Sequence, residues 1–257
     1  MLCAIRTEDE LKVMANKSEK VHGPFQCPAC KYALVLRKGN IKVHHFAHKT
    51  KGYCQRGEGE SETHKKCKES IYNALSQYDH ITDLDLEVDL GTVIADVFCV
   101  IQNVPVAIEI QRSNLSVNKI TERTSAYEKL GIYVLWLALF NKARFAKDHF
   151  SPSAWEKWCH ATYFGRVYYW VEELTITPVH FLPYEHYVEQ SSWYGEGGEE
   201  RHAGGYYKTS KRYKTLSLGT RLNLATDFKS SYKRAWSGGT VYIPGCRIYN
   251  DKRKKWW

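Results

Sequence analysis

The chain has 257 residues, of which 25% are charged and 43% hydrophobic, a balance typical of a soluble globular protein with more than one module. Its net charge of +9 is uneven, because residues 190–257 hold 14 Lys and Arg against 5 Asp and Glu, whereas residues 1–189 hold 23 of each. A basic region behind a neutral body favours a polyanionic partner. The N-terminus lacks the apolar run of a signal peptide, and the longest apolar run, 132–140, is too short to span a bilayer, so we expect a cytoplasmic location.

Cysteine and histidine gather near the N-terminus. Cys27 and Cys30 form a Cys-x2-Cys knuckle, and the segment HHFAH and then Cys54 follow at short range. Zn²⁺ takes four nitrogen or sulfur ligands in a tetrahedron, so this spacing predicts a structural zinc on the three cysteines and one histidine. His48 is the better fourth ligand and His45 the second choice. The alternative is free cysteines beside exposed histidines. The segment YALVLRKGNIKVHHF predicts a hairpin that carries the knuckle and turns at 38–40.

A helix is predicted from Ser61 to about Tyr78, after a linker at Gly57-Glu58-Gly59. Ser61 suits the N-cap position, where its hydroxyl accepts a backbone N–H. His64 and Lys68 are four residues apart and therefore share one face of this helix.

The stretch 92–111, TVIADVFCVIQNVPVAIEIQ, predicts two apolar strands that turn at Asn103-Val104-Pro105. Three polar side chains interrupt the strands, Asp96, Glu109 and Gln111, and the last two share a strand face. A two-residue loop at Asn103-Val104 places Asp96 opposite Gln111 and diagonal to Glu109, with roughly 5 to 8 Å between Cβ atoms. A three-residue loop would turn Asp96 to the other face unless a bulge restored it.

Two carboxylates on an apolar sheet are costly unless a cation or hydrogen bonds neutralise them. Converging oxygen ligands suit Mg²⁺ or Mn²⁺, so Asp96 and Glu109 are candidate ligands of a catalytic metal. The alternative is a pair of core carboxylates satisfied by Arg, Lys and backbone groups. The order of strand Asp, turn and strand Glu-x-Gln resembles the PD-(D/E)xK nuclease core, in which a Lys normally stands where this chain has Gln111.

The segments around this hairpin predict the rest of a core. A strand at 81–90 precedes it, a helix at 114–130 follows it with Ser116 as a possible cap, and 132–140 is a continuous apolar strand. The order helix, three strands, helix, strand predicts an α/β sandwich. In the second helix Arg123 and Tyr127 are four residues apart and share a face.

The C-terminal part changes in composition. Residues 151–189 predict an aromatic helix and two strands that cover a sheet edge, and beyond Gln190 the chain is rich in Gly, Tyr, Lys and Arg. Basic residues interleaved with aromatics suit a nucleic-acid strand, with cations on phosphates and rings on bases, whereas a solubilising tail is the alternative. The candidate nucleic-acid contacts are Arg123, Tyr127, Lys211, Arg212, Lys233 and Arg234.

These motifs together resemble the competence protein CoiA-like family. The matching pieces run in family order over roughly residues 25–140: CPAC, HFAH, CQRGEGESETHKKCK, IADV, IEIQRS and ITERTSAYEKLGIYVLWLAL. The resemblance implies a PD-(D/E)xK-type nuclease domain behind a zinc-binding module, acting on DNA. Carried over by position, Asp96 and Glu109 are metal ligands, Gln111 is the third motif residue, and His64 and Lys68 join them.

The family pattern itself has Gln in place of Lys at position 111. Because Gln brings no positive charge to the transition state, Lys68, Lys119 or Arg123 would have to supply it, or the metal would act alone. His64 would take a proton from the attacking water.

We therefore expect an α/β protein in four parts. Residues 1–56 form a zinc-binding β module, 57–150 a restriction-endonuclease-like (PD-(D/E)xK) core, 151–189 a helix and strands on that core, and 190–257 a basic, aromatic, nucleic-acid-binding extension. The expected function is Mg²⁺- or Mn²⁺-dependent hydrolysis of DNA, with Zn²⁺ structural. The alternative is a non-catalytic DNA-handling adaptor that keeps the nuclease fold, which the neutral Gln111 favours.

Overall fold

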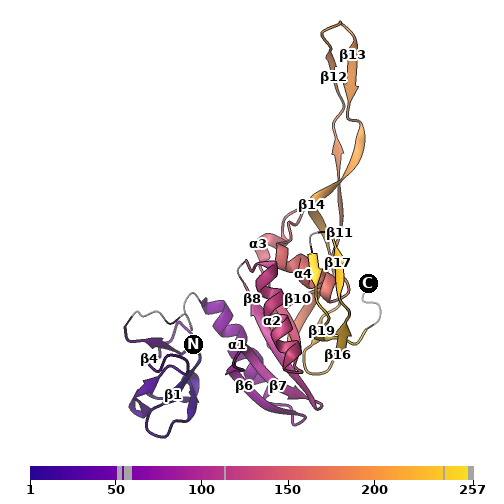
Figure 1. Ribbon diagram of the computed structural model, residues 1–257. Coiled ribbons are helices and arrows are strands. Elements are labelled where there is room, and N and C mark those ends of the chain that lie inside the picture. Colours follow the sequence, from indigo (N-terminus) through magenta and orange to yellow (C-terminus); the bar gives the residue numbers. More distant parts are fainter. Residues whose placement is uncertain (51–53, 55–59, 113, 240, 254–257) are drawn as a thin grey trace.

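The computed structural model describes residues 1–50, 54, 60–112, 114–239 and 241–253 (Figure 1). The linker expected at Gly57-Glu58-Gly59 lies outside the described residues. The α-helices are α1 (Glu62–Leu75), α2 (Val117–Lys129), α3 (Lys142–Phe145) and α4 (Ala154–Thr162), and 3-10 turns occupy Ala15–Lys17 and Lys20–His22. No helix in the described part of the chain has the length and apolar character needed to cross a membrane.

The N-terminal part folds as a five-stranded antiparallel sheet in the order β2-β1-β3-β4-β5, which confirms the predicted β module. Its strands are β1 (Cys3–Arg6), β2 (Lys12–Met14), β3 (Phe25–Gln26), β4 (Ala33–Arg37) and β5 (His45–His48). This sheet has a small apolar core of its own, which includes Phe25, Leu34, Leu36 and Phe46. The predicted hairpin forms as β4 and β5, but its connection spans 38–44 instead of a tight turn at 38–40.

The central sheet contains the predicted order of helix, three strands, helix and strand. β6 (Ile81–Asp89), β7 (Ile94–Ile101) and β8 (Val104–Gln111) form an antiparallel meander, and β9 (Tyr133–Leu139) lies parallel to β8. A parallel neighbour needs a crossover connection, which α2 provides. Ser61 and Ser116 cap α1 and α2 by accepting backbone N–H groups, as predicted, although α1 ends at Leu75 instead of Tyr78.

The strand pairing in the hairpin of β7 and β8 is shifted by two residues from the predicted pairing. Ile101 pairs with Val104, so the loop is Gln102-Asn103, and both loop residues have positive φ, at 50° and 65°. Positive φ at both positions is typical of a type I′ turn, which matches the twist of the flanking strands. The prediction that Asp96 lies opposite Gln111 is therefore wrong, since this register aligns it with Glu109.

The sheet continues beyond β9 with strands from the C-terminal part. β10 (Val167–Glu172) lies parallel to β9, and β11 (Thr175–Val188) and β14 (Tyr206–Leu218) follow antiparallel. The predicted aromatic helix of 151–189 forms as α4, and its two predicted strands cover the edge of β9 by extending the sheet. Three further strands join the same sheet: β15 (Leu222–Asn223), β16 (Phe228–Lys233) and β19 (Cys246–Asp251). Much of the region after residue 190 is thus part of the core sheet. The boundaries at 56, 150 and 189 stay predictions.

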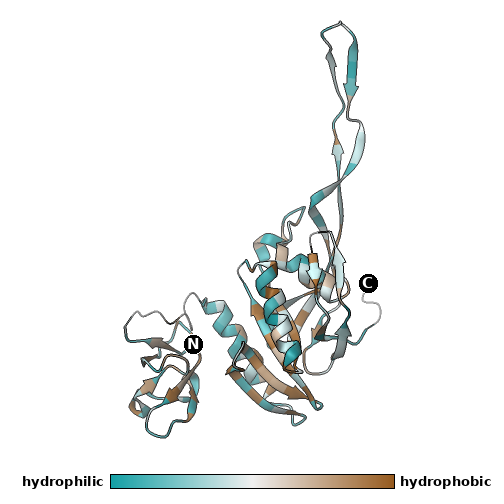
Figure 2. Ribbon diagram, viewed as in Figure 1, coloured by the Kyte–Doolittle hydropathy of each residue, from teal (hydrophilic) through white to brown (hydrophobic). Residues whose placement is uncertain are grey.

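The outer halves of β11 and β14 leave the body as a long two-stranded arm (Figure 1). The tip of the arm is the hairpin of β12 (Ser191–Tyr194) and β13 (Glu200–Ala203). Outside the arm, β17 (Trp236–Gly238) and β18 (Val241–Ile243) pair with each other as a separate two-stranded sheet. The arm is pale to teal in Figure 2, whereas the central strands are largely brown. Glu196, Glu199 and Glu200 lie in the tip segment with Arg201, so most acidic residues of the basic region gather there.

Candidate functional site

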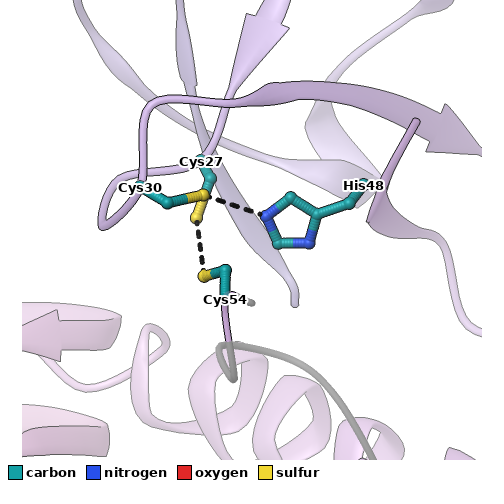
Figure 3. A group of neighbouring side chains, drawn as sticks. All are labelled: Cys27, Cys30, His48 and Cys54. Atoms are coloured by element: carbon teal, nitrogen blue, oxygen red, sulfur yellow. Dashed lines mark hydrogen bonds between the residues drawn. The ribbon is translucent and has the colours of Figure 1, made fainter. Parts of the chain in front are cut away.

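The cysteine and histidine motifs meet in one group, Cys27, Cys30, His48 and Cys54, whose ligand atoms all lie within 4.8 Å of one another (Figure 3). Cys27 and Cys30 lie in the turn between β3 and β4, and His48 is the last residue of β5. The group contains His48 and not His45. The His45 Nδ1 lies 2.8 Å from the Val43 carbonyl oxygen.

The spacing within this group fits a tetrahedral ion. The Sγ atoms of Cys27 and Cys54 are 3.9 Å apart, and the Cys30 Sγ lies 3.3 Å from the His48 Nε2. Tetrahedral Zn²⁺ with ordinary bond lengths places two sulfurs about 3.8 Å apart and a sulfur and a nitrogen about 3.5 Å apart. All four ligand positions are filled by protein, which is typical of a structural metal centre.

A second cluster combines residues of two helices and two strands. His64 and Lys68 lie on α1, Asp96 on β7 and Glu109 on β8, and α2 adds Arg123 and Tyr127. β7 and β8 stop pairing after Val97 and Ile108, so the ladder ends where Asp96 and Glu109 would face each other. The Asp96 carboxylate instead accepts the Ile110 N–H at 3.0 Å and so occupies the fork between the strands.

Asp96 is held by two side chains of α1. Its Oδ2 lies 3.1 Å from the His64 Nε2, and its Oδ1 lies 3.7 Å from the Lys68 Nζ. Burial by itself would raise the pKa of Asp96, but His64, Lys68 and the Ile110 N–H hold it well below its usual range. Asp96 is therefore ionised throughout the physiological pH range.

Glu109 is buried more deeply, at 1% exposure, and its partners come from α2. Arg123 Nη2 donates to Oε2 at 2.6 Å, and the Tyr127 hydroxyl donates to Oε1. Burial has the largest effect and, with the nearby Asp96 charge, raises the pKa of Glu109 to about 7 against the opposing effect of Arg123 and Tyr127. The two carboxylates thus differ in charge state near neutral pH, and further positive charge beside them would favour ionised Glu109.

Lys68 lies at the centre of three carboxylates and is only 3% exposed. Its ammonium group forms ion pairs with Glu60 and with Glu87, the latter at 2.6 Å, in addition to its contact with Asp96. Burial alone would lower the pKa of Lys68, but the three carboxylates raise it above its usual value. This buried ammonium is therefore a permanent charge.

Glu87 connects this cluster to the N-terminal sheet. Its carboxylate accepts the N–H groups of Leu2 at 2.9 Å and of Cys3 at 3.1 Å, as well as the Lys68 ammonium. Burial would raise the pKa of Glu87, but Lys68 and these donors lower it to about 2. On the ladder between β6 and β7, Glu87 lies opposite Asp96, between the pairs Leu86–Val97 and Val88–Ala95.

The sequence did not identify Glu60 or Glu87 as site residues. Glu87 has a positive φ of 52°, which departs from regular strand geometry. Glu60 lies beside the N-cap of α1, and its Oε1 is 3.3 Å from the His64 Nδ1. Their one sequence signal was proximity to predicted site residues.

The other predicted contacts divide between this cluster and the surface. Tyr127 is 0% exposed and bonded to Glu109, so its prediction as a nucleic-acid contact is corrected to a support of the carboxylate. Arg123 stacks its guanidinium 5.2 Å from the Trp136 ring. Lys211 and Arg212 lie on β14, Lys233 ends β16 and Arg234 follows it.

Asp96, Glu109 and Gln111 offer oxygen atoms of the kind that Mg²⁺ and Mn²⁺ bind. Within the described residues, the Cys27 group is the one set of three or more His, Cys, Asp or Glu ligands close enough to hold an ion. The two carboxylates at the fork would therefore need an amide oxygen, a backbone carbonyl or water as further ligands.

Replacing Lys68 by Met should destabilise the protein strongly, because the carboxylates of Glu60, Glu87 and Asp96 would lose their shared cation. We expect a loss of about 3–5 kcal/mol in the free energy of unfolding, measured by urea denaturation. Lys66→Met, at an exposed position two residues away, is the matched control and should stay within about 0.5 kcal/mol of wild type. Equal stability of the two variants would contradict the buried network.

The raised pKa of Glu109 predicts a pH dependence of stability. Between about 4.5 and about 7 the folded state keeps a proton that the unfolded state has lost, so this contribution to stability falls as pH rises and is constant above that window. Compared with Glu109→Gln, wild type should lose on the order of 1–3 kcal/mol between pH 5 and pH 8 in urea titrations without added Mg²⁺. Parallel pH curves for the two proteins would contradict it.

Two family descriptions match this chain. Competence protein CoiA, nuclease-like domain, matches residues 60–187, and Competence protein CoiA, N-terminal domain, matches residues 6–57. No curated protein and no solved structure gives a match. The carboxylate cluster lies in the first match and the cysteine and histidine group in the second. The chain therefore belongs to the competence protein CoiA-like family.

Proposed function

We propose that the chain is a metal-dependent nuclease that hydrolyses phosphodiester bonds in DNA. The observation that carries this proposal is the meeting of Asp96 and Glu109 at the fork between β7 and β8, within a helix, three strands, helix, strand unit. This arrangement resembles that of the PD-(D/E)xK nucleases, and on that ground we assign the unit to them. The match of 60–187 to a nuclease-like domain supports the assignment.

Asp96 and Glu109 would hold Mg²⁺ or Mn²⁺, with the Gln111 amide as a third oxygen donor. Such an ion lowers the pKa of a bound water and offsets the negative charge of the scissile phosphate. The raised pKa of Glu109 beside the charge of Asp96 supports the fit, because a cation at the fork would relieve the repulsion between the two carboxylates.

The side chains around the fork have separate roles in this proposal. His64 faces Glu60 with Nδ1 and Asp96 with Nε2, so both ring nitrogens point at carboxylate oxygens, and we assign it to positioning Asp96 instead of to proton abstraction. Arg123 is 28% exposed and sits on Glu109, where its guanidinium has access to a bound phosphate. We assign to it the positive charge that the family's Gln111 does not bring.

The second candidate is a non-catalytic adaptor that binds DNA with the same fold. A specific observation favours it: each carboxylate already has partners within the protein, His64 and Lys68 for Asp96 and Arg123 for Glu109. In this alternative the charges serve stability and the fork binds no metal.

Asp96→Asn and Glu109→Gln should each lower DNA cleavage by at least about 100-fold in the presence of Mg²⁺ or Mn²⁺, since each removes a metal ligand and keeps the side chain's shape. The double variant should be scarcely worse than either single variant, because ligands of one ion act as a unit. Glu122→Gln, an exposed carboxylate on α2, is the control and should cleave like wild type.

Gln111→Lys separates the two candidates. A working nuclease should keep or gain activity when the superfamily cation is restored at this position. If wild type and Gln111→Lys both leave single-stranded and double-stranded DNA and RNA uncut with either metal, the adaptor replaces the nuclease.

We propose further that the ion of the N-terminal group is a structural Zn²⁺. Cys27→Ser combined with Cys30→Ser should abolish the roughly one zinc per chain measured by elemental analysis and lower the melting temperature by roughly 10 °C or more, because binding energy at such sites is folding energy. His44→Ala changes a histidine of the same segment outside the group and should keep both. Zinc retained in the double variant would refute the ligand set.

A further inference from the structure

A cavity of about 780 Å³ lies between the N-terminal sheet and the start of α1. Its described lining comes from the end of β4, the connection 38–44 and the first turn of α1. Five of the lining residues are cationic: Lys20, Arg37, Lys38, Lys42 and Lys65. The lining shares Glu60 with the carboxylate cluster, but nothing in the proposed chemistry uses the cations of this cavity.

The charges of this cavity are only partly compensated within the protein. Lys38 pairs with Glu19 at 2.6 Å, and Lys65 pairs with Glu62 at 3.2 Å. For Lys20, Arg37 and Lys42 there is no carboxylate partner among the residues that the structure describes, and all three side chains are exposed. Unpaired cations gathered around one hollow create a positive potential that suits a polyanion.

The cavity also borders the carboxylate cluster. Glu60 lines the cavity and at the same time contacts His64 and Lys68, which in turn hold Asp96. One carboxylate thus separates the cationic lining from the fork at which we place the scissile phosphate. A strand reacting at that fork has further phosphates on each side, and the shared Glu60 makes this hollow a neighbour of the fork.

The hairpin that carries two of these cations is anchored at both ends by the metal group. Cys27 and Cys30 precede β4, which ends at Arg37, and His48 ends β5. In addition, Val43 in the connection donates its N–H to Glu62 of α1. The connection with Lys42 is therefore fixed against the helix that carries His64 and Lys68.

We propose that this cavity binds the backbone phosphates of the nucleic-acid strand next to the scissile position, through Lys20, Arg37 and Lys42. The inference rests on the proposed function and assigns part of the substrate path to the N-terminal module. The module's metal then has a second consequence, since it holds the phosphate-binding hairpin in place beside the site.

The test is binding of a fluorescein-labelled 20-nucleotide single strand and of the corresponding duplex by the full chain, without added divalent metal, at several salt concentrations. Arg37→Ala combined with Lys42→Ala should weaken binding at least tenfold at low salt. It should also reduce the slope of log affinity against log salt by about 0.7–0.9 per lost phosphate contact. Arg37→Lys with Lys42→Arg keeps the charge and should retain the wild-type slope.

The matched control removes two exposed lysines of α2 and α4, as Lys129→Ala with Lys157→Ala, and should keep the wild-type affinity. If the Arg37 and Lys42 variant binds like wild type, or if the control weakens binding equally, the inference is overturned while the nuclease proposal stands. If wild type binds neither oligonucleotide, both fail. Circular dichroism melts confirm that the variants fold.

Discussion

The structure depends on one buried cation. Lys68 joins Glu60 just before α1, Glu87 on β6 and Asp96 on β7, so a single ammonium group pairs with three carboxylates that are distant in sequence. Removing one partner from such a network is costly, because the remaining charges stay buried without compensation. Through the N–H groups of Leu2 and Cys3 on Glu87, the N-terminal sheet is attached to the same network. The arrangement of the two modules and the position of Asp96 therefore have a common cause.

The candidate site differs from an isolated pair of metal ligands. Asp96 is strongly acidic through its contacts with α1, whereas burial raises the pKa of Glu109 to about 7 despite Arg123. A cation at the fork would have to compete with His64 and Arg123 for the carboxylate oxygens. In the proposed mechanism Arg123 then becomes available for a phosphate, which links metal binding to substrate binding.

Sequence patterns predicted the features that depend on residues close together in the chain. The caps Ser61 and Ser116, the strand order and the Cys27 group followed from spacing and periodicity. Predictions failed where tertiary contacts decide. The turn lies at Gln102-Asn103, where both residues adopt positive φ, and not at the predicted position. The strands beyond residue 190 were missed because their sheet partners are distant in sequence. Glu87 was missed because its partners, Lys68 and the N–H groups of Leu2 and Cys3, are distant in sequence.

The central claim is that Asp96 and Glu109 share one divalent ion. The most direct measurement is anomalous diffraction from crystals of the full chain soaked in Mn²⁺. We expect one Mn²⁺ at the fork, coordinated by oxygens of both carboxylates, with the contacts from His64 and Arg123 released. A structure with Mn²⁺ absent from the fork at saturating concentration, and with both ion pairs intact, would contradict it.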